Sequence, residues 1–180
     1  RAFAGCALPP NLKTFSDTWN YYSYDGVTVA GFAPEAYSYA ALGGRATVKR
    51  LRFTWGRCYD KGRFEATAVL PNRSGAAAAF LYVRETPVSA TPTPSDDWPI
   101  DEIVRRGYAT VAFDGSELTP ANAKDAVSQR AWALRMLYDW AAKEPRIDEM
   151  TTGPVGCGKL DGVAALWAGS YDWRFYLCVA

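Results

Sequence analysis

The sequence predicts an α/β protein of three layers, in which helices cover both faces of a mixed, mostly parallel central sheet. Two observations lead to this prediction. The stretches 47–55 and 63–70 alternate apolar with polar residues, which is typical of two half-buried strands paired as an antiparallel hairpin. Beyond residue 70, short apolar runs alternate with helical patterns, an order that favours parallel strands joined by crossover helices.

The strands after the hairpin are predicted from their apolar runs. The runs 76–83 and 108–113 are almost wholly apolar, as expected for strands that are buried on both faces. Met150–Val155 is a weaker strand by the same criterion, and Phe175–Val179 is predicted as a last apolar strand.

Three helices are predicted between these strands. The first spans 97–106 and stops at Gly107. The second, 123–143, has an apolar stripe along one face and ends before Pro145. The third, 161–170, is rich in Ala and follows the weak strand. Together with the strands, these helices complete the three layers.

The first 46 residues show no clear periodicity. They are rich in aromatic residues and short turn signals, so we predict irregular structure with a short helix near Pro34–Ala41. The aromatic side chains either form a lid over one sheet face or offer a surface for a partner or a glycan. We therefore divide one domain into an irregular segment, 1–46, and an α/β region, 47–180.

Length and charge exclude several classes of function. The chain has 180 residues and 49% hydrophobic residues, enough for one domain with a core. Its net charge of +1 predicts no attraction to nucleic acid or to an anionic membrane. No apolar run approaches the roughly 20 residues that span a bilayer. Because the first residue is Arg rather than Met, we expect a chain that has been processed or cut from a longer one.

The cysteines and the single glycosylation sequon bear on the cellular compartment of the protein. None of Cys6, Cys58, Cys157 and Cys178 has metal-ligand spacing, and the chain has no His, so no metal or cofactor is predicted. Buried thiols and disulfides both remain open, with a secreted or other oxidising compartment slightly favoured. Cys157 and Cys178 are a candidate disulfide because they follow or lie in consecutive predicted strands. Asn72 opens an Asn-Arg-Ser sequon, a candidate glycosylation site.

Three stretches carry a family resemblance. They are Trp98–Ala109, Ala131–Trp140 and Ala164–Phe175, and the last is the most specific because of its spacing from the preceding turn. From about Leu70 to the end, the chain resembles the glucuronoyl-esterase family of carbohydrate esterases. The first 46 residues have no counterpart in it. The resemblance implies a truncated α/β-hydrolase fold for 47–180.

The turn before the last helix is the place where such hydrolases mount their nucleophile. The family's turn reads Gly-x-Ser-Arg-x-Gly-Lys. Alignment on Gly162 puts Lys159 at the Ser, Leu160 at the Arg and Val163 at the Lys, whereas a shift of one residue puts Gly158 at the Ser. In either alignment the Ser is missing, and no His is present to act as its base.

Two side chains near this turn are potential substitute nucleophiles. Lys159 could attack if its surroundings desolvated it, but a solvated turn lysine is the interpretation we favour. Cys157 could act as a thiol, but we favour a buried or disulfide-bonded cysteine. The sequence thus predicts no catalytic residue.

The functional prediction follows from these absences. We predict that the chain is not an enzyme but a non-catalytic structural or interaction protein, a subunit of a larger assembly. The alternative is a fragment of a glucuronoyl-type esterase whose remaining half comes from another chain. An apolar last strand with nothing after it would leave a sheet edge bare, which invites pairing with other subunits or with itself. The residues predicted to bind a partner there are Trp167, Trp173, Tyr176, Leu177 and Val179.

Overall fold

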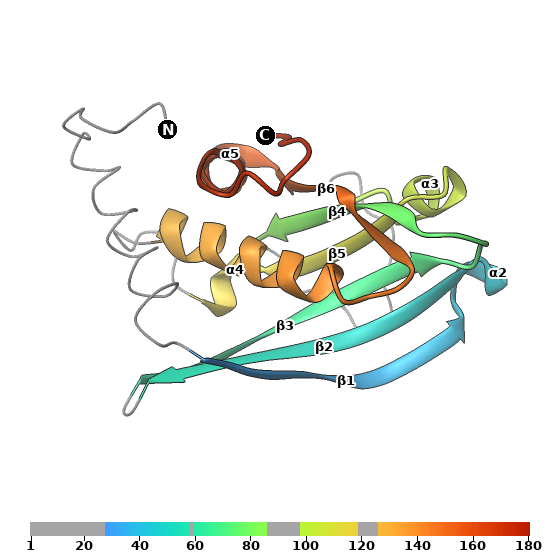
Figure 1. The fold of residues 1–180 in the computed structure, drawn as a ribbon, viewed down its shortest axis with the longest axis horizontal. Helices are drawn as coiled ribbons and strands as arrows, with labels where there is room; N and C mark the ends of the chain where they lie inside the picture. Colours follow the sequence, from blue (N-terminus) through green and yellow to red (C-terminus); the bar gives the residue numbers. More distant parts are fainter. Residues whose placement is uncertain (1–27, 58–59, 86–97, 119–125) are drawn as a thin grey trace.

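The computed structural model describes residues 28–57, 60–85, 98–118 and 126–180 (Figure 1). These residues form a sheet with helices on both of its faces. The strands are β1 (Thr28–Ala40), β2 (Ala46–Arg57), β3 (Asp60–Pro71), β4 (Ala77–Arg84), β5 (Ala109–Asp114) and β6 (Ile147–Gly156). The helices are the short turn α2 (Ala41–Gly44), α3 (Ile100–Arg105), α4 (Ala126–Ala141) and α5 (Gly158–Tyr171), and a 3-10 turn follows β5 at Gly115–Glu117.

In the described part of the chain the sheet has six strands in the order β1-β2-β3-β5-β4-β6. β1, β2 and β3 are joined antiparallel, and β3 is also antiparallel to β5. β4 lies between β5 and β6 and is parallel to both. The predicted fold class is confirmed: the predicted hairpin is β2–β3, and β5, β4 and β6 form the parallel part of the sheet.

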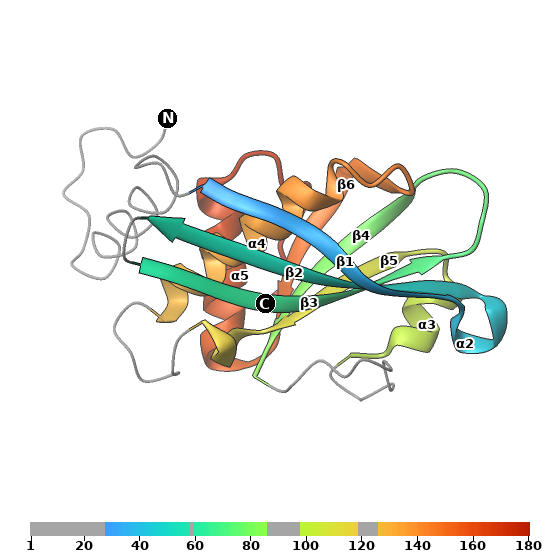
Figure 2. The ribbon, with the colours of Figure 1, turned by 90° about the horizontal axis from the view of Figure 1, so that it is seen from below.

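Side chains alternate between the two faces along β4 and β5, and each face has its own core. On one face Leu81 and Phe113 pack with α4 and α5, around the fully buried Trp132. On the other face Tyr82 and Ala112 pack with α3. Figure 2 shows α4 and α5 side by side and α3 apart from them, at the same end as α2.

Residues 28–40 depart from the prediction. They were expected to be irregular, with a short helix near Pro34–Ala41, but they form β1, which pairs along the outer side of β2. A Pro is tolerated there because an edge strand has one side without ladder hydrogen bonds. The described part of the N-terminal segment therefore belongs to the same sheet as the region 47–180, while 1–27 lie outside the described residues.

The predicted last strand, Phe175–Val179, forms only one isolated β-bridge. Val179 forms an isolated parallel bridge with Val155 of β6. The amides of Tyr176 and Val179 donate to the carbonyls of Thr152 and Pro154, both at 3.0 Å. The segment thus runs beside β6 without a continuous ladder.

Candidate functional site

The turn from β6 into α5 is a strand-to-helix elbow. Its tip is Gly158, whose φ of +84° lies in the left-handed region that favours glycine. A Cβ at Gly156 would overlap the carbonyl oxygen of Asp161, so glycine allows the first turn of α5 to lie directly against the end of β6. The elbow is thus built from two glycines with different physical roles.

The elbow geometry bears on the two sequence alignments. A hydrolase nucleophile stands at the strained tip of such a turn, and Gly158 is the residue with positive φ here. Lys159 and Leu160 lie inside α5, one and two residues beyond the tip. Gly158 is therefore the residue at the tip, as in the alignment that is shifted by one residue, and its correspondence to the family's Ser stays a prediction. A Cβ built at Gly158 meets no atom within 4 Å, so the tip faces open space.

Two hollows border this elbow, and both are lined by Tyr82 and Cys157. The first has a volume of about 270 Å³, lies on the α3 side of the sheet and is apolar. The second, of about 240 Å³, is polar and includes Gly158 in its wall. The apolar hollow is further lined by Phe80, Trp98, Pro99, Ile103, Thr110, Val155 and Val179. The polar hollow is further lined by Arg84, Glu85, Lys159, Leu160 and Asp161.

An ion cluster around the buried side chain of Arg130 connects the elbow to α4. Arg130 of α4 is fully buried, and its guanidinium lies 3.0 Å from the Asp161 carboxylate and 3.3 Å from Glu85. Burial raises the pKa of Asp161 to about 6, against the lowering effect of Arg130. The pair joins α4 to the first turn of α5 and so holds the elbow in place. Sequence reasoning missed it; the signal was that Arg130 falls on the apolar stripe of its helix, one turn from Ala126 and from Leu134.

The candidate disulfide does not form. Cys157 and Cys178 are both free. Cys157 is the N-cap of α5, whereas the Sγ of Cys178 packs against Gly169. Twelve residues of helix separate Cys157 from Gly169, about 18 Å at 1.5 Å per residue. The two sulfur atoms are therefore much too far apart for a bond. Cys6 and Cys58 lie outside the described residues.

The residues predicted to bind a partner divide into two groups. Trp167 is half-buried and packs against the main core, so it belongs largely to the interior. The other four are exposed, and Trp173 is the most exposed of them at 91%. The remaining three are Tyr176, Leu177 and Val179. The C-terminal segment thus carries an apolar surface.

The remaining predicted residues have structural contacts. Asn72 is exposed, but its side-chain amide donates to the carbonyl of Gly44 at 2.9 Å and its Oδ1 accepts from Thr47 at 2.6 Å. A glycan would have to displace the first of these bonds, and glycosylation stays a prediction. Gly162 is buried in α5, and Val163 is exposed on it. In the described ranges no three Cys, Asp or Glu side chains gather as metal ligands. No helix of those ranges is long and apolar enough to cross a membrane.

Comparisons with known proteins bear on the fold of this chain. No family profile matches the sequence, and no curated protein matches it. Solved structures do match. A glucuronoyl esterase from Solibacter usitatus superposes with a TM-score of 0.69 and 19% identity, over 92% of this chain and 55% of its own. The CE15 glucuronoyl esterase from Teredinibacter turnerae has a TM-score of 0.68 and 15% identity, over 96% and 52%. Acetyl xylan esterase 1 from Thermoanaerobacterium has a TM-score of 0.60 and 17% identity, over 94% and 62%.

This chain has the α/β-hydrolase fold of these carbohydrate esterases. The resemblance read from the sequence is thereby confirmed for the fold. The chain spans about half the length of the glucuronoyl esterases that it matches, so a truncated relative fits.

The prediction that the chain is not an enzyme is wrong. It rested on the missing Ser and on the absence of His from 180 residues. The solved structures that share this fold are esterases. Because this chain covers only about half of the glucuronoyl esterases, the residue types missing from it do not exclude a catalytic group elsewhere.

Proposed function

We propose that this chain is the elbow-bearing half of a carbohydrate-ester hydrolase. The observation that carries the proposal is the elbow itself, whose tip Gly158 borders the polar hollow and whose neighbour Cys157 lines both hollows. An ester lying across the elbow would rest one part in the apolar hollow and the other in the polar hollow. The names of the structural neighbours support glucuronoyl or acetyl esters of polysaccharides as the substrate class.

The nucleophile in this proposal is the thiol of Cys157. Gly158 has no side chain, and Cys157 is the nearest nucleophilic side chain that is exposed and free. A general base takes the thiol proton as the sulfur bonds to the ester carbonyl carbon. The ester C–O bond then breaks, and the alcohol leaves with that proton. Water, deprotonated by the same base, hydrolyses the thioester, which releases the acid and restores the thiol.

The start of α5 supplies the charge stabilisation that this reaction needs. The first N–H groups of a helix have no partner within the helix, and the Cys157 side chain does not cap them. They lie beside Cys157, where a developing oxyanion would form. Lys159, exposed in the same turn, adds a positive charge to the rim of the polar hollow.

The base and its acidic partner come, in this proposal, from a polypeptide that completes the sheet. β6 is an edge of the sheet, and the segment 176–179 only begins a further strand beside it. Eight large hydrophobic side chains are exposed among the described residues, and six of them lie between Val163 and Val179. An apolar edge of this kind favours pairing with a further strand. The completing polypeptide would place its base beside Cys157.

The test is ester hydrolysis by the complete natural protein, with benzyl glucuronate and acetylated xylan as substrates. We expect hydrolysis that Cys157→Ala lowers by about 100-fold or more, because it removes the nucleophile. Cys178→Ala is the matched control: this thiol is also free and exposed but packs against Gly169, so the rate should stay within about twofold. A quenched reaction should contain an acyl group on the peptide that carries Cys157.

Two outcomes would contradict the proposal at different points. No hydrolysis above the buffer rate would exclude a hydrolase for these substrates. Hydrolysis that is unchanged in Cys157→Ala would exclude the thiol mechanism and leave the nucleophile to the completing polypeptide.

A further inference from the structure

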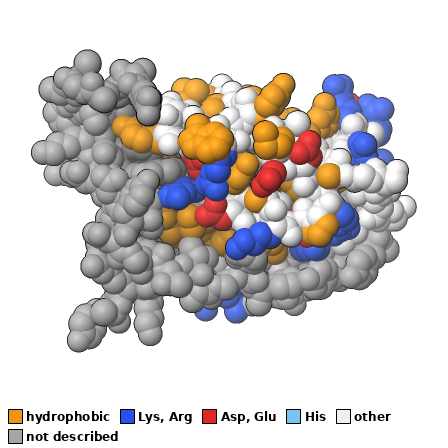
Figure 3. Space-filling model, viewed as in Figure 1, with side chains coloured by type: hydrophobic (Ala, Val, Ile, Leu, Met, Phe, Trp, Pro, Cys, Tyr) orange, Lys and Arg blue, Asp and Glu red, His pale blue; other side chains and the backbone are white. Residues whose placement is uncertain are grey.

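A third hollow, remote from the elbow, is lined by arginine side chains. It has a volume of about 390 Å³, and its wall includes Arg45, Arg73, Arg105 and Arg106. Figure 3 shows one group of Lys and Arg side chains at the upper right, at the end of the molecule that carries α3. We call the cavity lined by these four residues the arginine hollow.

Tertiary structure brings the four arginines together from three parts of the sequence. The antiparallel register pairs Ala46 with Pro71, which places Arg45 beside the turn after β3, and the amide of Asn72 donates to the Arg45 carbonyl at 2.8 Å. Arg73, in that turn, donates to the carbonyl of Gly107 at 3.3 Å, just beyond α3. This contact brings Arg73 to the two arginines that end α3.

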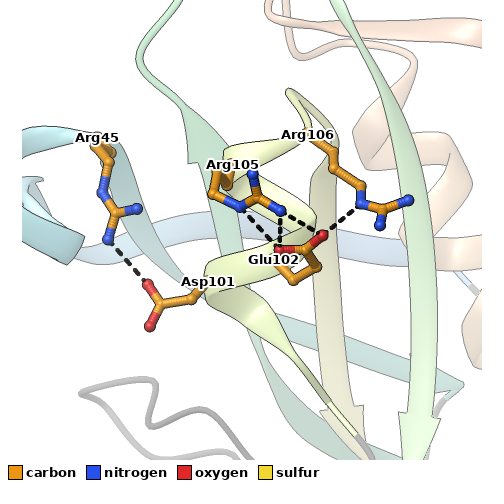
Figure 4. Close-up of polar contacts among 5 residues, drawn as sticks. All are labelled: Arg45, Asp101, Glu102, Arg105 and Arg106. Carbon is orange, nitrogen blue, oxygen red and sulfur yellow. Dashed lines mark hydrogen bonds and ion pairs between the residues drawn. The ribbon is translucent and has the colours of Figure 1, made fainter.

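The charges of the hollow do not cancel. Arg45 pairs with Asp101 at 3.2 Å, and Arg105 and Arg106 share Glu102, both at 2.6 Å (Figure 4). Hydrogen bonds from these two arginines hold the pKa of Glu102 below its usual range, so it stays ionised. Arg73 has carbonyl oxygens rather than carboxylates as partners. Four guanidinium groups thus face two carboxylates, and the hollow keeps two positive charges.

The arginines are available to a ligand. The side chain of Arg106 is 66% exposed and that of Arg105 is 63% exposed, and exposed ion pairs of this kind are weak because water screens them. A carboxylate or sulfate from solution can therefore compete with Glu102. Guanidinium groups bind such anions through two parallel N–H bonds, which favours this hollow over a lysine patch as an anion site.

We infer that the arginine hollow is an accessory site for an acidic polysaccharide, one that bears uronate carboxylates. The choice of a carbohydrate rests on the proposed function; the choice of an anion rests on the four arginines alone. The hollow lies near the start of β4 and the elbow near its end, so the eight residues of β4 separate them by roughly 20–25 Å. Only a polymer reaches both. The site would hold the polymer that carries the ester, without touching the reacting bond.

The experiment measures binding by calorimetry at low salt. The probes are polygalacturonate oligomers, neutral xylo-oligosaccharides, heparin oligomers and a short RNA. The test variant is R73Q/R105Q, and the control is R63Q/K143Q, which removes the same charge from two exposed residues outside the hollow. Wild type should bind polygalacturonate and not the neutral oligomers. R73Q/R105Q should weaken that binding by about tenfold or more, and the control by no more than about twofold.

The outcomes separate this site from the catalytic proposal. Hydrolysis of the small ester benzyl glucuronate should be unchanged in R73Q/R105Q, while hydrolysis of an acidic polymeric ester should show a raised KM. Equal weakening in both variants, equal binding of the neutral oligomers, or tighter binding of heparin or RNA than of polygalacturonate would each overturn the inference. Binding at the hollow is measured without turnover, so its result stands whether or not the protein hydrolyses esters.

Discussion

Arg130 is a charged side chain in the interior of the protein. It is fully buried, and its partners Asp161 and Glu85 come from α5 and from the end of β4. A buried charge is tolerated only while its partners are present, because removing one partner leaves the other without compensation. The cluster therefore links α4, β4 and the elbow. Its loss should lower the free energy of unfolding.

We predict that Arg130→Met lowers the free energy of unfolding by about 3 kcal/mol at pH 7.5, since Asp161 then remains buried without a cation. Urea denaturation followed by circular dichroism measures this. Arg106→Met is the control, because its ion pair is exposed to solvent and its loss should change the free energy of unfolding far less. Equal effects in the two variants would show that the buried cluster contributes nothing specific.

Asp161 should make stability depend on pH. Its pKa is raised from 3.8 to about 6 in the folded protein, so the folded state holds the proton more strongly than the unfolded state does. Stability from this group is complete below about pH 4 and is lost as the pH rises through 6. Asp161→Asn does not undergo this loss. The free energy of unfolding of Asp161→Asn, minus that of wild type, should therefore rise by about 2 kcal/mol between pH 4 and pH 7. Urea melts at both pH values measure it; a difference independent of pH would contradict the raised pKa.

At the scale of elements, the elbow depends on two glycines for different reasons. A Cβ at Gly156 overlaps the backbone of α5, whereas a Cβ at Gly158 meets open space but requires a left-handed φ. Backbone cannot move aside as a side chain can, so the first position is the less tolerant of the two.

We predict that Gly156→Ala lowers the free energy of unfolding by about 3 kcal/mol, because α5 must shift away from β6. Gly158→Ala should cost only about 1 kcal/mol, the cost of a left-handed residue with a side chain. Urea denaturation of the two variants compares them directly. The reverse order would mean that α5 is not held against the end of β6 as described.

At the scale of the whole molecule, the two edges of the sheet differ. β1 is the edge strand on one side, and β6 is the edge strand on the other, where the segment 176–179 partly covers it. Tyr176 is 69% exposed on that segment, and the exposed Trp173 lies three residues before it in the chain. When the polypeptide that we propose completes the sheet is absent, the same edge is free to pair with a second copy.

We predict that the 180-residue chain alone associates with itself at tens of micromolar, through this edge. The double variant Y176K/V179K should be monomeric at the same concentration, because lysine blunts an edge strand. Sedimentation velocity distinguishes the two states. T28K/S38K on β1 is the control for the opposite edge and should associate as wild type does. A wild-type monomer would contradict edge pairing.

The fold class was determined by the sequence, because burial leaves a local pattern. Alternation with period two gave β2 and β3, apolar runs gave β4 and β5, and the amphipathic stripe gave α4. The elbow was also found from the sequence, by the order of strand, glycines and helix. Each of these signals lies within a stretch of about twenty residues or fewer.

Only the tertiary structure decided the rest. β1 is a strand because β2 offers it a partner, and Gly158 is the elbow tip because of a dihedral angle that the sequence does not display. Arg130 meets Asp161 across two helices, and the arginine hollow joins residues 45 to 106. Contacts between distant residues depend on register and packing, whose physical cause is the whole fold rather than any local stretch of the chain.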